Sequence, residues 1–177
     1  MKKTIFLVSI FCTICAIAQS QVNFSAYSPI EYADFIKIFE STGNNDPGMS
    51  FFGRTFLRVH AILHEFPREL DDTDIDNIKD TLRSLGFNPN ISSQFGYKVE
   101  YVFVSNVDWQ RETRLVFYIQ RIQRQYFDSE YKLNDPIYWF LGFNHFNTFT
   151  QRGYFLISDF INEEQFINLG LESTTSP

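Results

Sequence analysis

Three histidines are the residues of this chain whose spacing suggests chemistry. His60 and His64 are four positions apart, so on a helix they would lie on one face, as paired zinc ligands do. His145 is the third and last histidine of the sequence. If the three imidazoles met, they would supply three nitrogen ligands and leave one position open for water or substrate. The pattern therefore admits a small zinc-dependent or histidine-based hydrolase.

The local sequence weakens the zinc hypothesis. It reads His60-Ala-Ile-Leu-His64-Glu65, without the glutamate that directly follows the first histidine in H-E-x-x-H enzymes. On a helical projection both histidines fall at the border of an apolar stripe, where imidazole rings commonly pack and form local hydrogen bonds. A structural role for the two histidines is the favoured interpretation, and the metal site is the alternative.

A second set of candidates lies late in the chain. On a regular strand Trp139, Phe143, His145 and Asn147 would share one face, and Asn144 would lie on the other. Apolar walls that end in a few polar groups are typical of small-ligand pockets. The competing interpretation is a core strand that becomes polar toward its end. These five residues are the predicted ligand site if the chain has one.

Two charged clusters have simpler explanations than a binding site. The acidic run 71–76 resembles the opening of a calcium loop, but Asn77 stands where that loop wants glycine and Arg83 where it wants glutamate. Acidic residues in the first turn of a helix complement its dipole instead. Ion pairs at solvated strand edges explain four arginines better than a single anion site does: Arg111, Arg114, Arg121 and Arg124.

Residues 1–20 have the pattern of a secretory signal peptide. Lys2 and Lys3 precede an apolar run, and Ala16 and Ala18 supply small residues at a cleavage site. The apolar run is shorter than the roughly 20 residues that a spanning helix needs, so a retained anchor is the weaker alternative. We therefore expect a secreted or periplasmic protein with no stable membrane insertion after cleavage.

Composition narrows the expected partners. Cys12 and Cys15 would leave with the signal, so the mature chain would contain no disulfide or thiol. The net charge of −6 becomes −8 when the two lysines of the signal are removed. An acidic chain is a poor binder of nucleic acid, so a small ligand or a partner protein is the expected class of partner. We predict a single domain over residues 21–171 and a flexible tail over 172–177.

The remaining chain predicts helices first and strands afterwards. Apolar residues at helical spacing, with capping residues and glycine stops, indicate helices over 28–39, 50–66 and 73–85. Aromatic and β-branched residues then indicate strands, because such side chains suit a half-buried pleated surface. The predicted strands cover 97–104, 113–120, 137 onward and 154–157, and a short helix is expected over 162–169.

This order predicts an α+β domain, with N-terminal helices packed on one face of a curved, mostly antiparallel, aromatic-rich sheet. The arrangement resembles the cone-shaped NTF2-like folds, in which helices close one side of a sheet around a pocket. The likeness concerns the fold and implies no activity. Two functions are carried forward: a non-catalytic binding or interaction module with its site on the late strands, and a hydrolase that uses His60, His64 and His145.

Overall fold

The computed structural model describes residues 23–30, 34–35, 37, 50–104, 112–147 and 152–171; the predicted signal peptide and tail lie outside these ranges. The chain is a mixed α+β protein, as expected, and none of its described helices is long and apolar enough to cross a membrane. The main elements are β1 (Ser28–Ile30), β2 (Ser50–Ile62), β3 (Arg68–Glu69), α3 (Asp72–Ser84), β4 (Phe95–Val104), β5 (Glu112–Gln120), α4 (Arg124–Glu130), β6 (Pro136–Asn147), β7 (Arg152–Asn162) and α5 (Glu163–Asn168).

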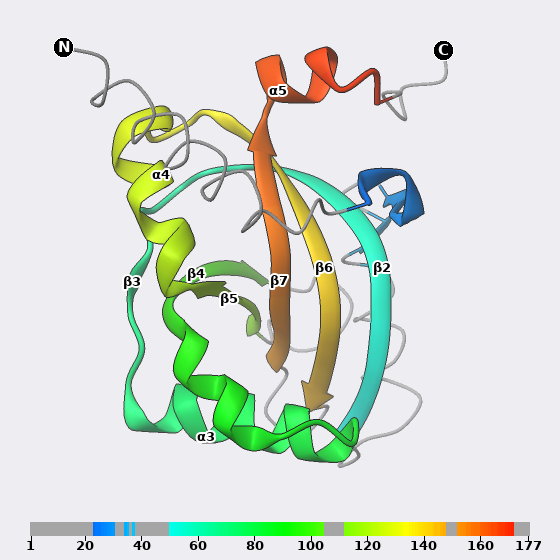
Figure 1. Cartoon of the computed structure of the whole chain (residues 1–177), viewed down its shortest axis with the longest axis vertical. Coiled ribbons are helices and arrows are strands. Elements are labelled where there is room, and N and C mark those ends of the chain that lie inside the picture. Colours follow the sequence, from blue (N-terminus) through cyan, green and yellow to red (C-terminus); the bar gives the residue numbers. More distant parts are fainter. Residues whose placement is uncertain are drawn as a thin grey trace, which may run out of the picture.

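Seven strands form one sheet that is not closed, in the order β1-β2-β6-β7-β5-β4-β3. Neighbours in sequence form the two expected antiparallel pairs, β4 with β5 and β6 with β7. The pairs β1–β2 and β5–β7 are parallel, so the sheet is mixed. Figure 1 shows β2, β6 and β7 as long strands that curve together. The predicted strands are confirmed, and each extends beyond the range that the aromatic residues marked.

The helix predicted over 50–66 is wrong, because this segment forms the long strand β2. Along its end Val59, Ala61 and Leu63 are buried while His60 and Ile62 are exposed, which is the two-residue period of a strand. The strand pairs along its length with β6. That pairing joins residues 74 to 97 positions apart in sequence, from Ile62 with Pro136 to Ser50 with Asn147, and it overrides the helical spacing of the local apolar residues.

The first predicted helix also begins later than expected. Ser28 and Pro29 do not cap a helix but lie in β1, which runs parallel to Leu57–Val59 of β2. Asp34, Phe35 and Lys37 are helical; the other residues of the predicted helix after Ile30 lie outside the described ones.

The third predicted helix is confirmed as α3. Its N-terminal cap is Asp71: the Asp71 side chain accepts the N–H of Asp74 at 2.9 Å, and the Asp74 side chain accepts the N–H of Asp71 at 3.0 Å. This reciprocal pair is a capping box, and it accounts for part of the acidic run without calcium. Gly86 ends the helix with a positive φ of 78°.

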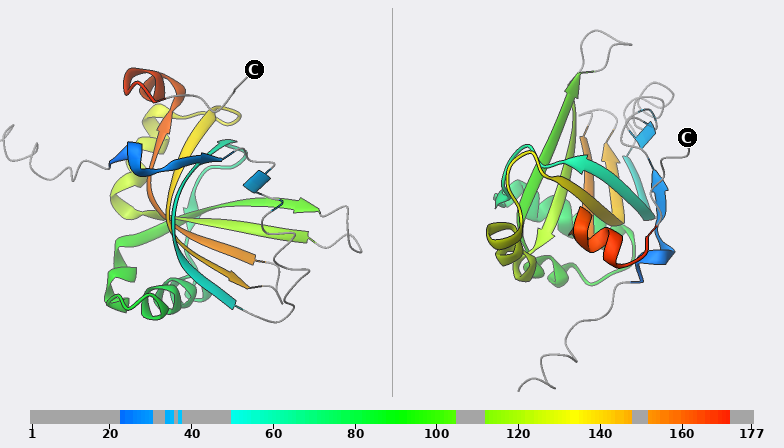
Figure 2. Two further views of the ribbon diagram at one scale, coloured as in Figure 1. Left: turned by 90° about the vertical axis from the view of Figure 1, so that its right-hand side faces the viewer. Right: turned by 90° about the horizontal axis from the view of Figure 1, so that it is seen from above.

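Both faces of the sheet are covered. One face, here called the Trp139 face, carries the largest apolar cluster and is covered by Phe127 of α4 and by Phe35. The opposite face, here called the Tyr118 face, is covered by α3 through Ile78. Figure 2 shows α3 and α5 at opposite ends of the molecule. The expectation that the N-terminal helices share one face is therefore wrong, because Phe35 and α3 pack on different faces.

A bulged corner bends the three long strands. Gly142 is the extra residue on β6 and Ser158 the extra residue on β7, and β2 shifts register at the same level. The two extra residues are in close contact, since a Cβ on Gly142 would lie 2.5 Å from the Ser158 hydroxyl oxygen. Bulges of this kind increase strand twist and bend. Each bulge also shifts the alternation of side chains by one residue, so that positions of the opposite parity face the Trp139 face beyond the corner.

Asp159, next to this corner, has a carboxyl group whose pKa is raised by burial; hydrogen bonds from the Phe160 N–H and the Gln123 side chain act in the other direction. A raised folded-state pKa contributes stability that is present below the unfolded value of about 3.9 and lost as pH rises through the folded value. Asp159→Asn should therefore raise the melting temperature at pH 7 by about 2–4 °C.

The rise in melting temperature caused by Asp159→Asn should disappear below pH 3.5, and thermal melts across the pH range measure this. Asp128→Asn is the matched control, because Asp128 is an exposed carboxylate paired with Arg124 at 2.6 Å. It should give no gain at pH 7. A neutral-pH melting temperature for Asp159→Asn at or below that of the wild type would contradict the assignment.

Candidate functional site

The segment that follows β2 sets the geometry of the candidate site. Leu63 donates its N–H to the Asp135 carbonyl at 3.0 Å and accepts the N–H of Asn134 at 2.8 Å, so the chain continues beside the start of β6. The Glu65 carboxylate then accepts the N–H of Glu100 on β4 at 2.9 Å. One short segment thus ties the end of β2 to β4, although three strands, β6, β7 and β5, lie between them in the sheet order.

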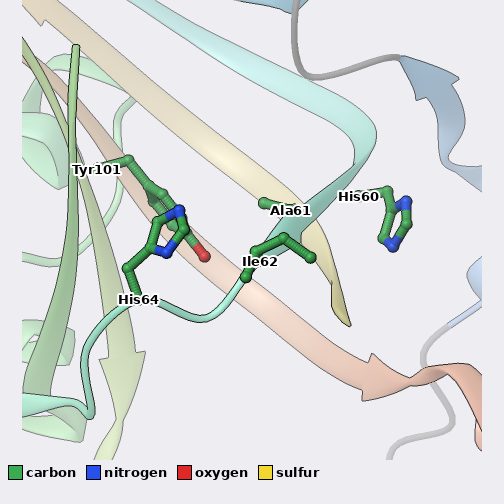
Figure 3. A pocket seen from close by; sticks show the side chains of 5 residues that line it. All are labelled: His60, Ala61, Ile62, His64 and Tyr101. Atoms are coloured by element: carbon green, nitrogen blue, oxygen red, sulfur yellow. The ribbon is translucent and has the colours of Figure 1, made fainter. Parts of the chain in front are cut away.

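A pocket of about 190 Å³ lies at this junction. It is lined by the end of β2, the segment after it and β4 through His60, Ala61, Ile62, His64 and Tyr101. Figure 3 shows Tyr101 reaching from β4 to the turn that carries His64, with His60 on the far side of Ile62. We call this site the seam pocket.

His60 and Ala61 belong to opposite faces of the sheet. Ala61 is part of the cluster on the Trp139 face. The His60 ring stacks on Tyr138 with centroids 4.4 Å apart and an angle of 10°, and Tyr138 stacks in turn on Phe166 of α5 at 4.0 Å. His60 is therefore an exposed ring at the end of an aromatic stack, and it also lines the seam pocket.

His64 and Tyr101 form the aromatic wall of the pocket. The two rings meet edge to face, with centroids 6.3 Å apart. The Tyr101 hydroxyl oxygen accepts a hydrogen bond from the Trp139 indole N–H at 2.9 Å, which fixes the phenol against the core. Trp139 is fully buried, so it positions Tyr101 without lining the pocket.

His145 lies away from the seam pocket. It is buried on the Tyr118 face beside Tyr154, with ring centroids 5.5 Å apart. Burial lowers the pKa of His145, and the charge of Asp80 on α3 partly offsets the effect. The residue is therefore an aromatic core partner beneath α3, held mainly in its neutral form at neutral pH.

The three histidines do not converge. Within the described residues, no group of three histidine, cysteine or acidic side chains lies close enough to hold a metal ion. The helical spacing that would have paired His60 with His64 is absent, because β2 is a strand and His64 follows its end. His145 does not contribute because it packs beneath α3.

The predicted late-strand site is also divided. Trp139 lies on the Trp139 face, whereas His145 contacts Tyr154 of the Tyr118 face. The bulge at Gly142 lies between them and reverses the alternation of side chains between the two faces of the sheet. The shared face expected for these residues is thus corrected. The side chains of Phe143, Asn144 and Asn147 lie outside the described part of the structure.

The arginines have individual partners. Arg114 contacts Glu112 at 2.6 Å and Glu100 at 3.4 Å, and Arg124 pairs with Asp128. Arg121 donates to the Ser93 carbonyl. Arg111 is outside the described residues. The three described arginines therefore form separate contacts and do not converge on one site.

A buried ionic cluster on the Tyr118 face had no signal in the sequence. Lys98 of β4 contacts Asp74 at 2.6 Å, Glu100 at 3.4 Å and Asp71 at 3.5 Å. The Tyr118 hydroxyl donates to Asp74 at 3.2 Å, and burial together with the Asp74 charge raises the pKa of Tyr118 far above its usual value. This cluster docks α3 on the sheet, so its role is structural.

Comparison of the chain with models of known protein families, with curated proteins and with solved structures finds no match. The function therefore has to be argued from the residues of this chain. Of the positions that the sequence singled out, His60 and His64 reach a shared pocket, and Tyr101 is the member that sequence reasoning missed. Its only advance signal was its place in an aromatic strand.

Proposed function

We propose that this chain is an exported, non-catalytic binding protein and that its ligand occupies the seam pocket. The observation that carries the proposal is the meeting of Tyr101 of β4 with Ile62 and His64, at the end of β2 and just after it, around an open space. The predicted signal peptide supports the export part. The NTF2-like resemblance is kept only as a likeness of a curved sheet with helices, since the seam pocket lies at the sheet edge.

The pocket favours a ligand with one aromatic ring and a small polar group. Its volume of about 190 Å³ is below the roughly 300 Å³ at which drug-sized sites begin, which suits a single ring. Ala61 and Ile62 supply an apolar floor, and the imidazole of His64 offers a hydrogen-bonding group beside it. A phenol combines the two chemistries.

The hydrolase alternative has less support. A histidine base needs a nucleophile or a bound water within hydrogen-bonding reach and a third group that orients it. In the seam pocket the two histidines are separated by Ile62, and the ring of His60 is engaged by Tyr138. We therefore assign His64 to ligand contact.

Titration with 4-methylphenol tests the proposal, with toluene as the matched probe that lacks the hydroxyl. The wild type should bind 4-methylphenol more tightly than toluene, and His64→Ala should weaken 4-methylphenol about tenfold, equivalent to about 1.4 kcal/mol. The measurement is ligand-observed NMR or calorimetry at pH 7.

The matched control is Ile122→Ala, which removes an exposed apolar side chain outside the pocket. It should leave the affinity unchanged. Equal affinities of wild type and His64→Ala for 4-methylphenol, or no binding at all, would contradict the proposal.

A further inference from the structure

The seam pocket lies beside a stretch of strand edge with no described partner. On the side away from β6, β2 pairs with β1 only through Leu57, Arg58 and Val59. Among the described residues, none pairs with the following stretch, His60–Ile62, on that side. Three of the five pocket residues, His60, Ala61 and Ile62, belong to this stretch.

The direction of the backbone groups follows from the pairing of β2 with β6. Leu63 directs both its N–H and its carbonyl toward Asn134 and Asp135, at the start of β6. Residues of an antiparallel pair alternate between facing the partner and facing away. His60 and Ile62, at odd offsets from Leu63, therefore direct their N–H and carbonyl groups outward. Ile62 stands opposite Pro136, which has no N–H to donate, in agreement with this assignment.

At Phe35 the described chain no longer runs along this edge of β2. Ile30 is the last residue of β1 and pairs with Val59. Five positions later Phe35 is helical and packs on Phe155 in the cluster of the Trp139 face, with ring centroids 5.4 Å apart. Strand β1 nevertheless shows that this edge of β2 accepts a parallel strand.

We propose that the occupant of the seam pocket is an aromatic side chain of an extended peptide, which adds as a strand to His60–Ile62. The inference rests on the proposed function and names its class of partner. Main-chain hydrogen bonds to an edge supply affinity in this mode, and a pocket for one side chain supplies specificity. The pocket volume suits one ring, and the added strand continues the interface that β1 already makes.

Charge and apolar surface define the partner further. The chain carries a net charge of −6, so a segment with basic residues is favoured during association. Ile62, Phe66 and Leu133 are exposed apolar side chains within four positions of the bonds that tie Leu63 to Asn134. The partner is thus a peptide with an aromatic residue at its centre, β-branched neighbours and basic ends.

The test uses the peptide acetyl-Lys-Thr-Val-Tyr-Val-Thr-Lys-amide and two variants at one position. Ile62→Pro removes the outward N–H, and Ile62→Val keeps it with a side chain of similar size. Proline is tolerated on strand edges where its missing N–H would face solvent, so the ladder with β6 should persist. Ile62→Pro should bind the peptide at least tenfold more weakly than Ile62→Val. Because Ile62 also lines the pocket, 4-methylphenol is titrated against both variants, and its affinity should differ between them by much less than that of the peptide.

A second measurement does not depend on the folding of either variant. The same peptide, N-methylated at its valines, should bind the wild type at least tenfold more weakly than the unmodified peptide. Equal peptide affinities in both comparisons overturn strand addition, while 4-methylphenol binding leaves the pocket proposal standing. Peptide binding that needs the Ile62 N–H, without any 4-methylphenol binding, supports strand addition and overturns the small-ligand site.

Discussion

Replacing Lys98 by Met is expected to lower the free energy of unfolding by about 3–5 kcal/mol. Lys98 and Asp74 are buried partners, with 9% and 6% of their side chains exposed, and their charged atoms are 2.6 Å apart. Methionine fills much of the same space but leaves Asp74 as a buried carboxylate without its cation. The loss of a partner to a buried charge is among the most destabilising single changes.

The pH dependence of this contribution has a definite sign. Burial alone would lower the pKa of Lys98, but its hydrogen bond to Asp74 and the charges of Asp74, Glu100 and Asp71 together outweigh burial and raise it. A raised folded-state pKa means that the stabilisation is fully present below the unfolded value of about 10.4 and lost as pH rises through the folded value. The difference between wild type and Lys98→Met should therefore be constant near neutral pH and shrink in strong alkali.

A double-mutant cycle separates the ion pair from the loss of packing. In Lys98→Met/Asp74→Asn the charge of Asp74 is removed, while the asparagine amide oxygen can still accept the N–H of Asp71 and the amide NH2 can donate to the Tyr118 hydroxyl oxygen. The double variant should be more stable than Lys98→Met alone, as measured by urea denaturation. Additive losses from the two single substitutions would contradict the assigned pairing.

Trp139→Ala is expected to be as damaging, at about 3–5 kcal/mol. Trp139 is fully buried, lies edge to face with Phe117 at 5.3 Å, and donates its indole N–H to Tyr101 at 2.9 Å. The truncation removes the largest fully buried side chain of the described residues. Chemical denaturation measures the loss in the free energy of unfolding, provided that the dependence of that free energy on denaturant concentration is compared between variant and wild type.

Tyr101→Phe is the companion variant for Trp139, since it removes the acceptor and keeps the ring. Leaving the buried indole N–H without this acceptor should cost about 1–3 kcal/mol. In a Trp139→Phe background the same change should cost less, because no indole N–H is left to satisfy. A small loss of stability for Trp139→Ala would contradict its assigned place in the core.

The elements with strong local signals were predictable from sequence. Helix α3 combines an acidic cap at Asp71, an apolar stripe and a stop at Gly86, all of which act within the segment itself. Strands β4 and β5 are rich in aromatic and β-branched residues, which suit a sheet with both faces covered. Local propensity and tertiary packing agree in these segments.

Strand β2 was mispredicted because its signal is mixed. Phe52 and Phe56 are four residues apart, as on one face of a helix, whereas Val59, Ala61 and Leu63 carry a period of two at the end of the strand. Pairing with β6 decides the outcome, and a pairing across so many positions leaves no local mark. The helical geometry assumed for His60 and His64 failed with it.

The candidate site depends on contacts that no local pattern encodes. Tyr101 meets His64 only because the segment after β2 crosses to β4 through the bond between Glu65 and Glu100. The bulge at Gly142 placed His145 beneath α3, and an isolated glycine in a strand was its only advance signal. The sequence therefore indicated which residue types matter, and the curvature of the sheet determined which of them meet.

The most direct test of the seam pocket is the detection of intermolecular nuclear Overhauser effects in a complex with 4-methylphenol. The ring protons of the ligand should give effects to the methyl groups of Ala61 and Ile62 and to the ring of Tyr101, which line the pocket. Effects confined to exposed methyl groups elsewhere, such as those of Ile122 and Ile167, would contradict the account.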